Sequence, residues 1–167
     1  EDEIREAVDT ARAGGCSELA LLTCVSNYPA MPSDYNLSRI VDMRERFQTV
    51  VGLSDHTLDN TCAIASITLG GCIIEKHFTL DRKGGGADDS FSLEPNDMKN
   101  LCESSLAAWQ SIGLPEYGTK STEKNNAQYR RSLYFVKSLK KGDVIKIDDI
   151  RSVRPGFGLP TKMFDSV

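Results

Sequence analysis

Strand-length apolar runs alternate with amphipathic helical patterns along this chain, and no other feature of the sequence limits the fold as strongly. The apolar runs cover residues 19–25, 49–53 and 72–78. Helical periodicity marks residues 4–11, 37–47 and 61–69, and a further stretch from residue 95 onward. Runs that are apolar on both faces are typical of strands in parallel sheets. We therefore expect three parallel βα units, either from a β/α barrel or from a short doubly wound sheet.

The length and composition narrow the class of protein. The 167 residues are 40% apolar and 26% charged, as in ordinary soluble globular proteins. A complete eight-fold barrel needs about 250 residues, and the chain begins at Glu1 without Met. We therefore expect part of a longer protein. No apolar run approaches the ~20 residues of a membrane span, and no secretory leader is present, so we expect no membrane partner.

The five cysteines are odd in number, widely spaced and placed mostly in apolar-periodic segments. This pattern indicates buried thiols in a reducing compartment rather than a disulfide framework or a CxxC metal site. We expect a cytoplasmic protein.

The character of the sequence changes after residue 113. Residues 114–126 are polar and predict a linker, and residues 127–167 predict the start of a small β-rich domain with strands at 132–137 and 144–147. Residues 119–167 carry eleven Lys and Arg against five Asp and Glu. A solvated basic face explains this charge, and attraction of an anionic small molecule is the alternative. The segment lacks the interleaved aromatic residues of nucleic-acid binding, so we expect no nucleic-acid partner.

The two histidines occupy equivalent positions, because His56 follows the second apolar run and His77 closes the third. Consecutive parallel strands are neighbours about 4.8 Å apart, so the two imidazoles can converge on one cation. Alternation along a strand places Ser54 on the face of His56, and Glu75 on the face of His77. Mixed nitrogen and oxygen ligation suits Mn²⁺, Zn²⁺ or Co²⁺. Two structural histidines are the alternative.

Other polar residues lie where strands give way to loops. Glu75 is either a partner of a metal-bound histidine, an acceptor for sugar hydroxyls, or half of a salt bridge to a lysine on another strand. Ser26 and Asn27 are phosphate donors or ordinary turn residues. Residues 84–89 form a Gly-rich loop, which is either a lid that carries Asp88 or Asp89 or a solvent loop.

Four motifs together resemble the sialic acid (N-acetylneuraminate) synthase family. They are CVSNYP at 24–29, GLSDHT at 52–57, GGCIIEKHFT at 70–79 and RPG at 154–156. The resemblance covers nearly the whole chain. Within the family, FSLEP at 91–95, RRSL at 130–133 and RPGFGLP at 154–160 look closest to pseudaminic acid synthases.

The resemblance implies a (β/α)8 TIM barrel followed by an antifreeze-like SAF (β-clip) domain, in a domain-swapped homodimer. Residues 1–113 would supply strands six to eight of the barrel, and residues 127–167 would begin the SAF domain. Such enzymes condense phosphoenolpyruvate with an N-acylated amino-sugar aldehyde to a nine-carbon 2-keto acid and release phosphate. Arg154 would reach the active site of the partner subunit.

The resemblance also assigns the catalytic residues. His56 and His77 would bind a divalent metal, usually Mn²⁺, with Mg²⁺ and Co²⁺ as other candidates. Glu75 is the third catalytic candidate because of its place on the face of His77, not because of the resemblance. N-acetylneuraminate and legionaminic acid synthases are alternative functions. Two further alternatives are a different metal-dependent barrel enzyme, such as an aldolase, and a non-catalytic α/β binding module with structural histidines.

The remaining residues assigned by resemblance bind the substrates. Ser54 would donate a hydrogen bond to phosphoenolpyruvate, and Ser26 or the adjacent Asn27 would contact its phosphate. Tyr28 and Asp88 would contact the amino sugar.

We expect the isolated 167-residue chain to be inactive as a synthase. In the family, the lysines that bind phosphoenolpyruvate and the N-terminal glutamates come from barrel strands other than the three predicted here. A steady-state assay of the isolated polypeptide with phosphoenolpyruvate and candidate amino sugars checks this expectation. Measurable turnover contradicts it.

Overall fold

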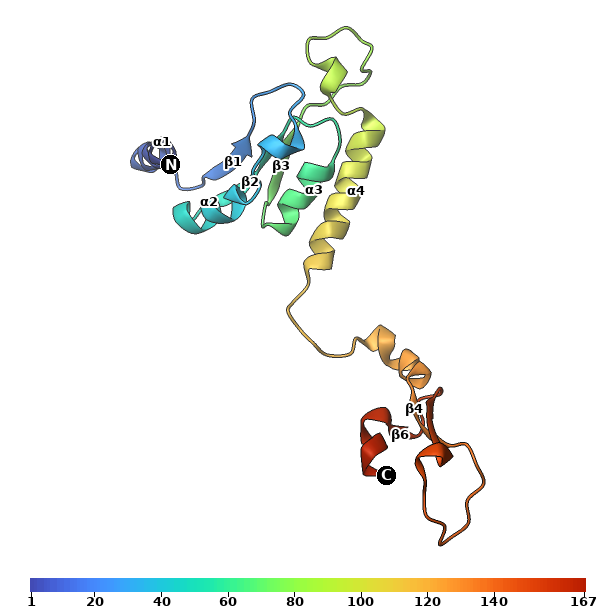
Figure 1. The fold of residues 1–167 in the computed structure, drawn as a ribbon. Helices are drawn as coiled ribbons and strands as arrows, with labels where there is room; N and C mark the ends of the chain where they lie inside the picture. Colours follow the sequence, from blue (N-terminus) through green and yellow to red (C-terminus); the bar gives the residue numbers. More distant parts are fainter. The chain divides into compact units, whose positions relative to one another are not determined.

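The computed structural model describes all 167 residues and divides them into two compact units, Glu1–Leu114 and Pro115–Val167 (Figure 1). None of the helices has the length and apolar character that crossing a membrane requires.

The first unit is a parallel α/β structure, as the alternating pattern predicts. Its elements in chain order are α1 (Asp2–Ala13), β1 (Ala20–Cys24), α2 (Arg39–Phe47), β2 (Val50–Asp55), α3 (Thr61–Thr68), β3 (Ile73–Lys76) and α4 (Pro95–Ile112). Short 3-10 turns lie at Pro32–Asp34 and Asp89–Phe91. The three strands pair in parallel in the order β1-β2-β3. Strand β2 continues two residues beyond the predicted end, because its pairing with β3 extends to Asp55 and Lys76.

One face of the sheet carries the apolar core. Val51 of β2 packs with Val8 of α1 and with the α2 residues Ile40, Met43 and Phe47. Leu53 of β2 packs with Tyr35 and with Cys62 of α3. The opposite face bears Val50 and Ile73, which are 49% and 39% exposed. Helices on one side only are typical of a β/α barrel, whereas a doubly wound sheet is covered on both faces.

Local hydrogen bonds set the helix starts that follow β2 and the Gly-rich loop. The Asp59 carboxylate accepts the Thr61 N–H at 2.8 Å, at the start of α3, and this bond lowers the pKa of Asp59. Pro95 opens α4, and Asp97 accepts the N–H of Glu94 at 3.3 Å. The loops that end at these helices therefore have defined conformations.

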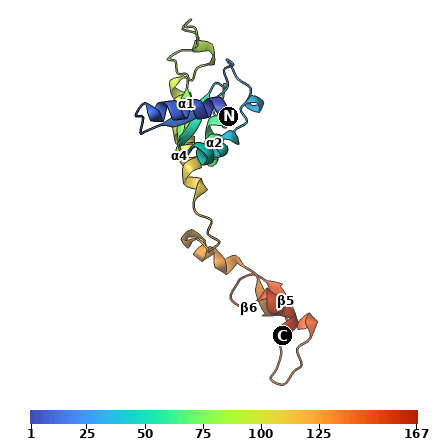
Figure 2. The ribbon, with the colours of Figure 1, turned by 90° about the vertical axis from the view of Figure 1, so that its left-hand side faces the viewer.

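The second unit is a small antiparallel sheet. It comprises β4 (Ser132–Phe135), β5 (Ile150–Val153) and β6 (Leu159–Pro160) in the order β5-β4-β6, labelled across Figures 1 and 2. Segments of 3-10 helix cover Ser121–Tyr129, Ile147–Asp149 and Thr161–Ser166. Part of the predicted linker 114–126 therefore belongs to a 3-10 helix.

The strand predicted at residues 144–147 is wrong. Val144 and Ile147 are 80% and 74% exposed. The Lys146 N–H donates to Asp149 Oδ2 at 2.8 Å instead of to a neighbouring strand. Alternation of apolar and polar residues indicates a strand only where one face is buried, and here neither face is.

The prediction of buried cysteines is also wrong for most of them. All five thiols are free, and only Cys62 is buried, where desolvation raises its pKa. Cys24 and Cys72 are exposed at the end of β1 and immediately before β3. Cys24 pairs with Ser54 on the face of the sheet opposite the helices, which no layer covers, so its thiol stays exposed.

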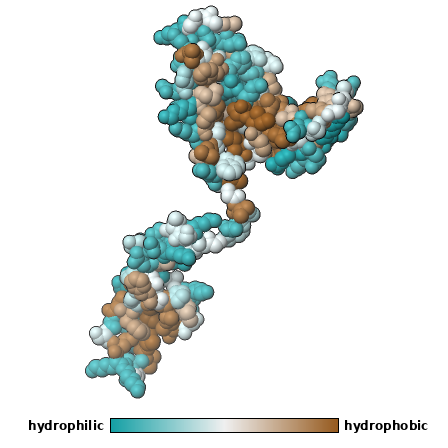
Figure 3. Space-filling model, turned by 180° about the vertical axis from the view of Figure 1, so that it is seen from behind, coloured by the Kyte–Doolittle hydropathy of each residue, from teal (hydrophilic) through white to brown (hydrophobic).

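Apolar side chains also gather on the surface of each unit (Figure 3). On α4, Leu106, Trp109 and Ile112 are 55%, 64% and 52% exposed. Contiguous exposed apolar side chains of this kind mark surfaces that make further contacts.

Gly52 of β2 provides a test of the sheet packing. A Cβ there would overlap the carbonyl oxygen of Ile73 and lie 2.6 Å from Leu22 Cδ2. We expect Gly52→Ala to lower the free energy of unfolding by about 1–3 kcal/mol, because added volume forces neighbours to shift. Urea unfolding followed by circular dichroism measures this change.

Gly14→Ala is the matched control, because the nearest atoms to a Cβ there lie at 3.4 Å, an ordinary contact distance. Equal stabilities of the two variants would contradict the close approach of β2 and β3.

Candidate active site

The carboxyl ends of β2 and β3 bring the two histidines together. His56 directly follows β2, and His77 directly follows β3. Their ring centroids lie 5.3 Å apart with planes at 66°. A hollow of about 260 Å³ opens between them and is lined by Ser54, His56, Glu75, Lys76 and His77. Two side chains that are far apart in the sequence therefore share one small polar site.

Hydrogen bonds fix the tautomer of His56. Its Nδ1 lies 2.7 Å from the carbonyl oxygen of Val25. Because a carbonyl oxygen can only accept, Nδ1 carries a proton, and in the neutral imidazole Nε2 then keeps its lone pair. Nε2 lies 3.5 Å from Ser54 Oγ. The Ser54 hydroxyl is therefore the one hydrogen-bond partner of Nε2 within the chain, at a distance long enough for a ligand to replace it.

The backbone of His56 is held as firmly as its ring. Its N–H donates to the hydroxyl of Tyr35 at 2.6 Å, and its carbonyl accepts the Ala30 N–H at 2.9 Å. Tyr35 is completely buried, and burial raises its pKa to about 12. Tyr35 was not among the residues predicted from the sequence, since it lies in an irregular segment where no periodicity marks it.

His77 is more open and lies beside the Gly-rich loop. Its Nδ1 is 3.5 Å from Asp88 Oδ2, and its ring centroid is 5.2 Å from that of Phe91. Its carbonyl accepts the N–H of Leu93 at 2.8 Å, so the loop returns to the sheet at this residue.

Of the two acidic residues in the predicted lid, only Asp88 faces a histidine. Asp89 instead accepts hydrogen bonds from Thr79 Oγ1 and from the N–H of Gly86, both at 2.7 Å. The bond from Thr79, followed by that from Gly86, lowers the pKa of Asp89. Asp89 therefore closes the loop, and Asp88, whose side chain is 60% exposed, is available to a ligand.

The other predicted residues differ in their relation to the histidine pair. The Tyr28 ring lies 4.3 Å from that of His56, at 34°. Glu75 is exposed and lines the hollow, and it forms no salt bridge. Ser26 and Asn27 are exposed in the turn after β1. Arg154 is exposed in the second unit, directly after β5.

A buried ion pair lies on the helix side of the same strand ends. Lys76 Nζ is 2.8 Å from Asp55 Oδ2, and the two side chains are 2% and 0% exposed. This pair was not predicted, although the sequence contains a signal for it. Asp55 and Lys76 each precede a histidine, so the alternation that places the histidines together on one face places these two residues together on the other.

The donors present suit a divalent cation that keeps open positions. His56 offers a free Nε2 within a ring held by a backbone carbonyl, which is the usual support of a metal-binding histidine. Nowhere in the chain do three His, Cys, Asp or Glu side chains converge on one point. Water or substrate oxygens would have to complete the coordination shell of a metal bound by His56 and His77.

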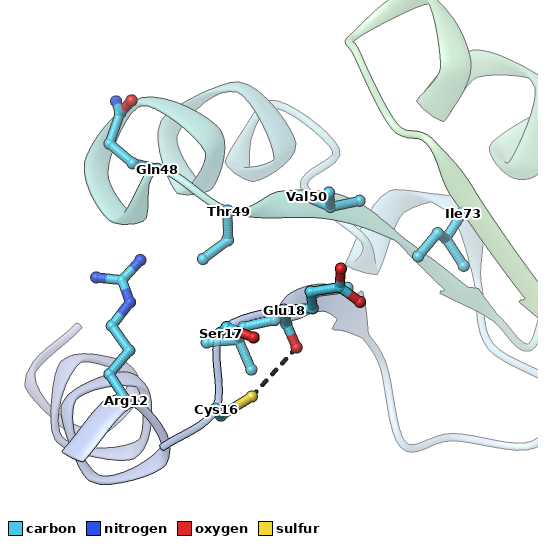
Figure 4. A pocket seen from close by; sticks show the side chains of 10 residues that line it. Arg12, Cys16, Ser17, Glu18, Gln48, Thr49, Val50 and Ile73 are labelled. Atoms are coloured by element: carbon cyan, nitrogen blue, oxygen red, sulfur yellow. Dashed lines mark hydrogen bonds between the residues drawn. The ribbon is translucent and has the colours of Figure 1, made fainter. Parts of the chain in front are cut away.

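A larger hollow of about 510 Å³ lies near the amino ends of β1 and β2 (Figure 4). Arg12, which lines it, donates to the carbonyl oxygen of Phe47 at 2.8 Å. This hollow contains no histidine, and ligand sites of parallel α/β folds lie at the opposite, carboxyl ends. We therefore place the candidate site at the histidine pair.

Comparison with known proteins connects this site to a family. Residues 1–117 match the model of the NeuB family. The chain is 32% identical to the pseudaminic acid synthase of Campylobacter jejuni over 167 residues, which cover 100% of the chain and 49% of that protein. It is 38% identical to the N,N'-diacetyllegionaminic acid synthase of Legionella pneumophila over 162 residues, which cover 94% and 46%.

A solved structure agrees with the sequence relatives. The N-acetylneuraminic acid (sialic acid) synthetase of Leptospira borgpetersenii, crystallised with citrate, superposes with a TM-score of 0.67 at 30% identity, covering 75% of this chain and 44% of that one. The chain spans about half the length of the curated relatives that it matches. The parallel α/β unit, its two strand-end histidines and these matches lead to one conclusion: the chain belongs to the NeuB family.

Proposed function

We propose that this chain is part of a nonulosonic acid synthase, comprising the last strands of its barrel and the start of the domain that follows, and that its activity is most similar to that of pseudaminic acid synthases. The enzyme condenses phosphoenolpyruvate with an N-acylated amino-sugar aldehyde, forms a nine-carbon 2-keto acid and releases phosphate. The observation that carries this proposal is the histidine pair. His56 is fixed with Nε2 free, and its ring lies 5.3 Å from that of His77.

In this proposal, His56 and His77 bind a divalent cation, with Mn²⁺ as the first candidate and Mg²⁺ or Co²⁺ as others. A bound cation of this kind supplies a Lewis acid that polarises the sugar aldehyde. The buried Ser54 hydroxyl lies beside His56 Nε2, where it can donate to phosphoenolpyruvate. Glu75, exposed in the same hollow, accepts hydrogen bonds from sugar hydroxyls.

The residues around the hollow divide between the two substrates. Tyr28 covers His56 with an aromatic face and, with Asp88, contacts the amino sugar. Ser26 and Asn27, exposed after β1, donate to phosphate. Asp88 is near enough to His77 to bring a bound hydroxyl close to the pair.

The wider architecture follows from the same proposal. Strands β1 to β3 become strands six to eight of a (β/α)8 barrel, and the rest of the barrel covers the open sheet face that bears Val50 and Ile73. Residues 127–167 begin an antifreeze-like SAF domain, and residues 114–126 connect it to the barrel. In a domain-swapped homodimer, Arg154 serves the site of the other subunit. Free thiols suit a reducing compartment, so we propose the cytoplasm.

The relatives also support a second candidate function. Identity to the legionaminic acid synthase is 38%, against 32% for the pseudaminic acid synthase. A legionaminic acid synthase, or an N-acetylneuraminate synthase, would use the same histidine pair with a different sugar. If the protein is not an enzyme, the alternative is a non-catalytic α/β binding module in which the histidines are structural.

Replacing either histidine tests the site. In the protein as its gene encodes it, we expect His56→Asn and His77→Asn each to lower both Mn²⁺ affinity and kcat by at least about 100-fold, because loss of a ligand exceeds the 10–100-fold effect of losing an outer-shell partner. Isothermal titration with Mn²⁺ and steady-state kinetics measure the two quantities.

Glu103→Gln serves as the control for this experiment, because that side chain is 65% exposed on α4. Unchanged Mn²⁺ binding and rate in both histidine variants would contradict the assignment of the metal site.

The choice of sugar is tested by product formation. We expect the protein as its gene encodes it to release phosphate from phosphoenolpyruvate with the amino sugar that leads to pseudaminic acid, and at most slowly with the legionaminic and neuraminic precursors. Phosphate release and mass spectrometry of the 2-keto acid measure this preference. A preference for another precursor overturns the sugar assignment, and no turnover with any of them favours the binding module.

A further inference from the structure

The ammonium group of Lys76 lies at the centre of a buried network behind the histidine pair. Besides the carboxylate of Asp55 at 2.8 Å, it donates to the carbonyl oxygens of Thr57 at 2.8 Å and Asp59 at 2.6 Å. Three acceptors satisfy the three protons of an ammonium group. The Lys76 side chain is 2% exposed, and of its three partners Asp55 and Thr57 are buried and Asp59 is exposed.

This network encloses His56 from both sides along the chain. Asp55 precedes His56, and Thr57 and Asp59 follow it. The other oxygen of the Asp55 carboxylate accepts the Thr57 N–H at 2.9 Å. The segment that leaves β2 therefore curls around one ammonium group, and His56 lies within that curl.

Lys76 is also the residue that precedes His77, at the end of β3. Its backbone leads directly into His77, and its side chain holds the loop after β2 that begins with His56. Pairing of Asp55 with Lys76 across β2 and β3 gives this link a fixed register. A displacement of the Lys76 side chain would therefore alter the separation of the two rings.

Stability alone is a weak explanation for this arrangement. A buried ion pair gains little over a well-packed apolar pair, because desolvation of both charges opposes their attraction. The bond to the carbonyl of the buried Thr57 is different, because no apolar side chain can replace it and an unpartnered buried carbonyl is costly. Besides balancing the charge of Asp55, the ammonium group fixes the backbone conformation of residues 57–59.

We propose that Lys76 is a positioning residue, which fixes the orientation of His56 and its distance from His77 by holding the loop after β2. This inference rests on the proposed function only in that the positioned histidines are taken to bind a cation. Removing an outer-shell group typically weakens metal binding by about 10–100-fold, and we expect a loss of that size without loss of the fold.

The test uses Lys76→Met in the protein as its gene encodes it, with Lys99→Met as control, because the Lys99 side chain is 72% exposed on α4. The first readout is the ¹⁵N chemical shifts of the His56 imidazole in metal-free protein. We expect wild type and control to show Nδ1 protonated, and Lys76→Met to show a mixture of tautomers. The second readout is Mn²⁺ affinity, expected to fall about 10–100-fold in Lys76→Met only.

A double variant separates positioning from charge balance. Asp55→Asn combined with Lys76→Met removes both charges but leaves an oxygen at residue 55 to accept the Thr57 N–H. The proposal predicts that the double variant regains thermal stability relative to Lys76→Met but keeps the tautomer mixture and the weak Mn²⁺ binding. Recovery of wild-type tautomer and affinity would overturn the proposal, as would wild-type behaviour of Lys76→Met. Loss of the folded state in both variants would also overturn it, because Lys76 would then support the whole fold.

The two readouts keep this inference apart from the proposed function. If wild type binds no Mn²⁺ and has no synthase activity, the proposed function fails, while the imidazole shifts still decide whether Lys76 positions His56. If wild type is active but Lys76→Met keeps the wild-type shifts and affinity, only the positioning role fails.

Discussion

The in-register parallel pairing of β2 with β3 is the constraint on which the site depends. It aligns Ser54 with Glu75 and Asp55 with Lys76. Since side chains alternate between faces, the same register assigns each next residue as well. It places the histidines that follow the strands on the open face, and the ion pair on the face that packs against helices. A shift of one residue would exchange the two sets, putting imidazoles into the apolar core and charges onto the open face.

The two faces of the strand ends have different physical roles. On the helix side, the charges are buried and every proton of the Lys76 ammonium group has an acceptor. On the open side, donors are left free. His56 has one nitrogen committed to a backbone carbonyl and one available. Asp88 is exposed beside His77, and Glu75 is exposed in the same hollow. Rigid support behind a site with free donors in front is the arrangement that preorganised binding requires.

Much of this arrangement was predictable from the sequence, and the exceptions have physical reasons. Strand-length apolar runs and helical patterns predict the three βα units, and strand parity places the two histidines on one face. Tyr35 was missed because an irregular loop carries no periodicity. The strand at 144–147 was wrongly predicted because alternation does not reveal whether a face is buried. The burial of Cys24 was wrongly predicted because Cys24 lies on the sheet face that no helix covers, a property of the assembled layers that no single segment encodes.

We propose that two imidazoles from successive strands bind one cation in the active site of this member of the NeuB family. The most direct measurement is pulsed electron paramagnetic resonance of Mn²⁺ bound to the protein as its gene encodes it, with ¹⁵N-labelled histidine. The account predicts hyperfine coupling to two imidazole nitrogens, since His56 and His77 are the only histidines of this chain and each provides one ligand. Any further histidines that the gene encodes are replaced in a control variant. In that variant, coupling of Mn²⁺ to only one imidazole nitrogen, or to none, would contradict the two-histidine site.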